Sequence, residues 1–133
     1  MAFGTATVTT NTGKAIAAKR LTGGSSPSQA EPHYMAIGVG ATGAARTASA
    51  ADTALSSEVS RTGANNGTTV TTTQTNDTYQ VVQSFTASAP WAVDEAALFD
   101  ASSAGNTFMS ATFPVVNLQS GDSIQLTTQV QLA

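Results

Sequence analysis

The chain of 133 residues contains no cysteine and a single histidine, His33. Without cysteine it has neither disulfides nor thiolate ligands, and one imidazole does not make the usual nitrogen and sulfur shell of a zinc site. His33 follows Pro32 at the entry to an expected strand. Hydroxyl side chains are so common in the chain that a serine near His33 says nothing about a catalytic pair. We therefore expect no catalytic residue and no metal site.

Charge is also scarce, because charged residues make up only 10% of the chain and the net charge is −3. Soluble domains usually carry about 25% charged residues. The densest basic stretch, Lys14, Lys19 and Arg20, is too small a positive face to bind phosphates, so we expect no nucleic-acid partner. Small neutral polar residues replace the missing charges, and such a surface is easily desolvated against other protein.

Long apolar runs are missing as well. No stretch approaches the roughly 20 apolar residues that span a bilayer, and the first ten residues, MAFGTATVTT, lack the basic and apolar regions of a signal peptide. We therefore expect no membrane partner. The few aromatic residues are spread over expected strands and are typical of core filling. Trp91, directly after Pro90, is the exception that we expect at a contact surface.

The segment NTGKAIAAKRLTGG predicts a helix over about 12–22. Thr12 is the expected N-terminal cap, and two glycines follow the last turn. Ile16 and Leu21, with alanines between them, predict a narrow apolar strip that packs on a sheet or on another chain.

The rest of the chain predicts strands. HYMAIGVG alternates like a half-buried strand, and from Glu58 onward short β-rich segments follow one another at roughly ten-residue spacing. Asn65-Asn66-Gly67 predicts a hairpin between the first two of these. The last segment, SIQLTTQVQL, alternates most cleanly, with one apolar and one polar face. We expect an all-β fold, an antiparallel β-sandwich or jelly-roll-like domain over residues 11–133 with one short helix, preceded by an extended N-terminal arm over residues 1–10.

The stretch YMAIGVGATGAA holds Gly38, Gly40 and Gly43 in the G-x-G-x-x-G spacing of dinucleotide-binding turns. A strand precedes them, and Glu58 lies about 20 residues further on. However, no helical apolar period follows Gly43, and the chain continues as strands instead of a second βαβ unit. We expect these glycines to allow close packing at a strand end, and we expect no cofactor.

The carboxylates offer no clear catalytic pair. Asp94 and Glu95 are the only adjacent acidic residues, and neighbours on a strand point to opposite faces, so they are not expected to share a substrate. Asp77 and Asp122 lie in turn signals. A calcium or glycan site built from such loops stays open, although no EF-hand spacing supports calcium.

Five segments carry a resemblance to a known group of proteins. In order, they are NTGKAIAAKRLTGG, EPHYMAIGVGATGAARTASAADTALSSEVSR, TNDTYQVVQSFTA, DEAALFDASSAGNTFMSATFP and NLQSGDSIQLTTQVQL. From about Asn11 to Leu132, the chain resembles small virion structural proteins of tailed bacteriophages, labelled tail-fibre or minor structural proteins, some of which are similar to capsid cement (decoration) proteins. Asp94 departs from the group, in which a threonine commonly precedes the glutamate.

The resemblance implies assembly without catalysis. It predicts a capsid cement subunit on the virion surface, assembled in the cytoplasm of the bacterial host and bound to the major capsid protein and to copies of itself as a homotrimer. The alternative is a tail appendage or baseplate subunit that contributes to host or glycan attachment. We expect contacts through Phe3 and Val8 of the arm, which would pair with a neighbour's sheet edge, through Lys19 and Arg20, and through Trp91.

Overall fold

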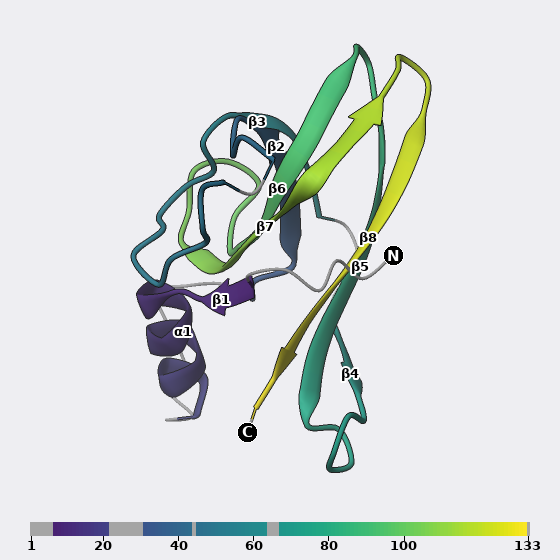
Figure 1. Ribbon diagram of the computed structural model, residues 1–133. Helices are drawn as coiled ribbons and strands as arrows, with labels where there is room; N and C mark the ends of the chain where they lie inside the picture. Colours follow the sequence, from purple (N-terminus) through teal and green to yellow (C-terminus); the bar gives the residue numbers. More distant parts are fainter. Residues whose placement is uncertain (1–6, 22–30, 44, 64–66, 133) are drawn as a thin grey trace.

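The structure is a computed structural model that describes residues 7–21, 31–43, 45–63 and 67–132. Within this part of the chain, eight strands and one helix are arranged as two antiparallel sheets (Figure 1). The elements are β1 (Thr7–Thr9), α1 (Asn11–Leu21), β2 (Tyr34–Val39), β3 (Glu58–Thr62), β4 (Thr68–Val70), β5 (Thr78–Thr86), β6 (Trp91–Phe99), β7 (Thr107–Leu118) and β8 (Ser123–Gln131). The predicted fold class, an all-β antiparallel sandwich with one N-terminal helix, is confirmed.

The larger sheet has the order β1-β7-β6-β2-β3, and the smaller sheet has the order β4-β5-β8. The connections from β5 to β6 and from β7 to β8 both pass from one sheet to the other, at the same end of the sandwich (Figure 1). There the Ala87 N–H donates to the Asp122 carbonyl at 2.8 Å, and the Gly121 N–H donates to the Ala87 carbonyl at 2.7 Å. These two bonds tie the crossovers together.

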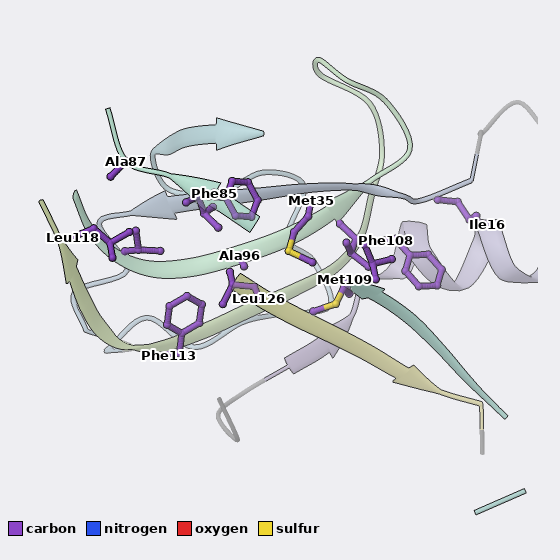
Figure 2. Packing of buried hydrophobic residues seen from close by; sticks show 14 residues of the cluster. Ile16, Met35, Phe85, Ala87, Ala96, Phe108, Met109, Phe113, Leu118 and Leu126 are labelled. Carbon is purple, nitrogen blue, oxygen red and sulfur yellow. The ribbon is translucent and has the colours of Figure 1, made fainter. Parts of the chain in front are cut away.

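The main apolar core lies between the two sheets. Figure 2 shows Phe85 and Leu118 at one end of the core and Ile16 of α1 beside Phe108 at the other. The burial of β8 follows the predicted alternation. Leu126 on the apolar face is buried, whereas Gln125 and Gln129 on the polar face are exposed. The periodicity of two therefore assigned the faces of this strand correctly.

β2 is buried on both faces, whereas its alternation predicted a half-buried strand. Met35 and Ile37 belong to the main core, and Ala36 forms a second small cluster with Ala97 and Phe99 of β6, against which Leu55 packs. Leu55 comes from the segment between β2 and β3. This connection therefore covers part of the outer face of the larger sheet, over β2 and β6.

The helix spans Asn11–Leu21, close to the predicted range of 12–22, but its cap is Thr10 and not Thr12. The Thr10 hydroxyl accepts the Gly13 N–H at 2.9 Å, which is the bond an N-cap residue makes to the third residue of the helix. Ile16 is buried, whereas Leu21 is 88% exposed. Of the two residues expected to form an apolar strip, only Ile16 packs into the core.

The prediction of an extended arm over residues 1–10 is wrong for residues 7–10. Thr7–Thr9 pair antiparallel with Met109–Ala111 of the same chain, and Thr10 is fully buried. These residues belong to the sandwich, which therefore begins before residue 11. Residues 1–6, including Phe3, lie outside the described residues.

The hairpin expected between 58–64 and 68–75 is also wrong. β3 pairs with β2 in the larger sheet, whereas β4 pairs with β5 in the smaller sheet. β4 ends at Val70, and turns occupy much of the stretch up to Asp77. Asn65 and Asn66 of the expected turn lie outside the described residues. A local turn signal does not decide which sheet each flanking strand joins.

Candidate functional site

The glycine-rich turn after β2 binds an anion, and that anion is a side chain of the same protein. The two carboxylate oxygens of Asp94 accept the N–H groups of Ala41 and Gly43, each at 3.0 Å. Gly40 and Gly43 have φ angles of +94° and +67°, which favour glycine. Successive backbone N–H groups in such a turn form a concave anion site. A dinucleotide phosphate would have to displace the Asp94 carboxylate, which is itself buried.

Asp94 reaches the turn from an irregular point of the larger sheet. The β6–β7 register shifts between Val93 and Glu95, and the β2–β6 register shifts beside Val39, so Asp94 has no partner in either ladder. Glu95, fully buried, also bonds to the connection between β2 and β3. The alternation of a regular strand predicted that the two carboxylates act apart. In the structure both bind the same 41–57 segment, through different donors.

Glu95 is the buried centre of an ion network whose other members are partly exposed. One of its oxygens accepts the Ser57 N–H at 3.1 Å, and the other accepts the Arg46 guanidinium at 2.7 Å. Arg46 also pairs with Asp52 at 3.1 Å, and Asp52 accepts the Ser110 hydroxyl of β7 at 2.7 Å. The 41–57 segment is thus fastened to β6 and β7 by charge-assisted hydrogen bonds.

The network shifts the ionisation of its members. Burial alone would raise the pKa of Asp52, but hydrogen bonds from the Ser49 N–H, Ser110 and Arg46 outweigh it and hold that pKa below its ordinary value. Burial likewise disfavours the charged form of Arg46, yet its bonds to Glu95 and Asp52 raise its pKa. Both groups are therefore held in their charged forms.

Gly38 has a steric role beside this network. A Cβ atom at this position would lie 2.6 Å from the Glu95 Oε1 atom and 2.8 Å from the Ser57 carbonyl oxygen. The expectation that the glycines permit close packing is confirmed at Gly38.

Three further carboxylates fold back onto turns. Asp77 accepts the N–H groups of Thr72, Thr73 and Gln74. The bond from Gln74 has the largest effect, and together these bonds lower the pKa of Asp77 well below its ordinary value. Asp122 accepts the Gln119 N–H at 2.8 Å. The turn placement of Asp77 and Asp122 predicted from sequence is confirmed.

Asp100 acts in the same way on the turn after β6. It accepts the Asn106 N–H at 2.6 Å and the Asn106 side-chain amide at 2.7 Å. Beside it, Arg61 pairs with Glu58 at 2.6 Å, lies over the Phe99 ring at 3.7 Å and donates to two carbonyls of the 101–104 turn. Within the described residues, no group of three or more His, Cys, Asp or Glu side chains is placed to hold a metal ion.

An apolar groove with a cavity of about 350 Å³ lies between α1 and the smaller sheet. Ile16, Phe108 and Val130 line it, and Tyr79 donates its hydroxyl to the Pro32 carbonyl at 2.9 Å. Burial, and secondarily the charge of Glu31, raise the pKa of Tyr79 to about 12. This volume is at the lower end of the range for ligand pockets. The Tyr79 hydroxyl, a polar group of the lining, already donates its hydrogen bond to Pro32 of the same chain.

The predicted contact residues do not form one patch. Val8 in β1 is half-buried opposite Ser110, whereas half-buried Trp91 lies opposite Leu118, eight residues further along β7 and so about 25 Å away. Lys19 and Arg20 are exposed in the last turn of α1. His33 lies directly before β2, as predicted, with its ring 4.5 Å from that of Tyr34.

No protein-family model, curated protein or solved structure matches the chain. The resemblance to phage virion proteins therefore stays a prediction. No helix among the described residues is long and apolar enough to cross a bilayer.

Proposed function

We propose that this chain is a non-enzymatic structural protein of a tailed-phage virion, a capsid cement subunit that stabilises the head by bridging capsid subunits. Its partners in this proposal are the major capsid protein and copies of itself, as a homotrimer. The trimer and the location on the head come from the resemblance alone.

The use of the acidic residues carries the proposal. Every one of them except Glu31 accepts a hydrogen bond or ion pair within the chain. Catalytic carboxylates have to meet a substrate, whereas these hold loops and turns to the sheets. The polar face of β8, by contrast, consists of neutral Ser, Thr and Gln side chains, which suit contacts with other protein.

The location of the protein in the particle tests this function. Gold-labelled antibodies and quantitative mass spectrometry of purified virions should find it on heads, in numbers comparable to the three-fold positions of the capsid. Labelled tails with few copies would favour the tail appendage or baseplate subunit instead. Absence from particles would contradict both.

The corrected arm boundary sharpens a second experiment. Deletion of residues 1–6 should abolish binding to heads that lack the protein while leaving its melting temperature unchanged. Deletion of residues 1–10 should lower the melting temperature as well, because it also removes β1 and the Thr10 cap. Normal decoration by the shorter deletion would show that Phe3 makes no essential contact.

The basic end of α1 is tested with a matched pair of variants. Arg20→Glu should weaken attachment to heads, whereas Lys14→Glu, an equally exposed change in the first half of the same helix, should weaken it less. Since an exposed ion pair contributes about 0–1 kcal/mol, a several-fold difference in affinity is the expected scale. Equal effects of the two variants would leave Arg20 without a specific role.

A further inference from the structure

The four outermost strands of the two sheets differ in how they are protected against pairing with another chain. In the described part of the chain, β1 and β4 have three residues each. β3 has five residues, its ladder with β2 is interrupted by a register shift, and Glu58 and Arg61 place a salt bridge on it. Short length, bulges and charges are the devices by which proteins keep sheet edges from pairing.

β8 has none of these devices. It is nine residues long, contains no charged residue and no proline, and pairs with β5 without any register shift. On its other side, no residue in the described part of the chain pairs with it. Among the strands that the structure describes, β8 therefore offers the longest regular edge.

Hydrogen bonds at both ends of the β5–β8 ladder establish which backbone groups face outward. The Leu132 N–H donates to the Asp77 carbonyl, and the Ala87 N–H donates to the Asp122 carbonyl. Both pairs continue the register of the ladder, in which hydrogen-bonded and non-hydrogen-bonded pairs alternate. The even-numbered residues of β8 thus bond to β5. The outward N–H and C=O groups belong to Ser123, Gln125, Thr127, Gln129 and Gln131.

We propose that the open edge of β8 binds the same edge of a second copy of this chain, antiparallel about a two-fold axis at Thr127. This contact rests on the proposed function in one respect, because that function makes copies of the same chain its partners. This register pairs Thr127 with itself, Gln125 with Gln129 and Ser123 with Gln131. It is the one two-fold register that pairs all the outward residues of β8.

The inner face of β8 is self-complementary in the same register. Ile124 and Val130 are only half-buried, although their side chains face the core. About the axis at Thr127, Ile124 of one copy lies opposite Val130 of the other. In antiparallel ladders such non-hydrogen-bonded pairs bring side chains closest together, so both apolar groups become covered.

On the polar face, the strand already forms cross-strand contacts of the kind that pairing would add. The Gln129 side-chain amide donates to the Gln80 side chain at 2.7 Å, and Gln125 donates to Ser84 at 3.3 Å. Pairing of two β8 strands places Gln125 beside Gln129 of the other copy, without any like charges opposed. The edge therefore fits a second copy on both faces.

Because the chain contains no cysteine, a single introduced thiol tests the register directly. Across the axis, hydrogen-bonded partners have Cα atoms about 5.5 Å apart, within the range of a disulfide. Under mild oxidation Thr127→Cys should give a covalent dimer on a denaturing gel. Ser84→Cys, at an exposed site on β5 outside the β8 edge and beyond the residues that β4 covers, should not. No dimer from Thr127→Cys, or equal yields from both variants, would overturn the proposal.

A charge variant provides an independent measurement. Thr127→Lys places two ammonium groups opposite each other at the axis, and their repulsion should break the contact. Light scattering of the full chain should then give half the wild-type mass, whether the wild-type particle is a dimer or a pair of trimers. Ser84→Lys should keep the wild-type mass. Unchanged mass of folded Thr127→Lys would overturn the proposal. Cross-linking on isolated protein and labelling of virions are separate results, so failure of the proposed function would not be mistaken for failure of this contact.

Discussion

Replacement of Asp94 by asparagine tests whether this carboxylate holds the glycine-rich turn. The carboxylate accepts two backbone N–H groups at 3.0 Å from a position that is 2% exposed. An asparagine side chain has one acceptor oxygen, so its NH₂ group has to face one of the two donors. Asp94→Asn therefore loses one charge-assisted bond, weakens the other and leaves a donor without a partner.

The loss should amount to about 2–3 kcal/mol, since a hydrogen bond to a charged group contributes about 1.5–3 kcal/mol. For a chain of this length, about 4 °C per kcal/mol converts this to a melting temperature lower by about 8–12 °C. Calorimetry measures the shift, and hydrogen exchange followed by NMR should show faster exchange at Ala41 and Gly43. Asp122→Asn, in an exposed turn with one such bond, is the control with the smaller effect. A melting temperature within 1–2 °C of wild type, about 0.5 kcal/mol, would refute the role of Asp94.

Three further outcomes follow from the same contacts. Gly38→Ala should lower the urea midpoint, at a cost of about 1–3 kcal/mol, because its Cβ would lie 2.6 Å from the Glu95 Oε1 atom; an unchanged midpoint would contradict that clash. Asp52 has a lowered pKa in the folded protein, so it stabilises the fold above its ordinary pKa of 3.8 and this contribution is lost as the pH falls below that value. Melting curves at pH 5 to 2 should therefore show the difference between wild type and Asp52→Asn shrinking with acid, and a constant difference would contradict the shift. Absorbance titration at 295 nm should show an ionisation near pH 12 that Tyr79→Phe removes, and a tyrosine signal complete by pH 11 would refute it.

The regular part of the fold was predictable from the sequence. Alternation of apolar and polar residues identified β8 and its two faces, and the turn signal at Asp122 lies directly before this strand. These signals are local, because a strand's face pattern depends only on its own residues. Pairing between distant strands leaves no such local signal, which is why the sheet assignments of β3 and β4 were wrong.

The ion network escaped prediction for a related reason. A register shift at Asp94 redirects its side chain, and such shifts do not appear in an alternation pattern. A weaker signal was present, because between Leu21 and Ser60 Arg46 is the lone lysine or arginine, and Asp52 follows it by six residues. An isolated arginine in an alanine-rich connection suggests an internal carboxylate partner, but the choice of Glu95 depends on the fold.

A two-fold contact through β8 limits how far a sheet built from this chain can grow. In a pair joined through β8, the outermost strand on either side would be β4, whose three residues cover only Thr78–Gln80 of β5. A two-fold contact uses up the same edge on both molecules, so the assembly closes on itself. Concentrated protein should then stop at a finite particle and not extend into fibres.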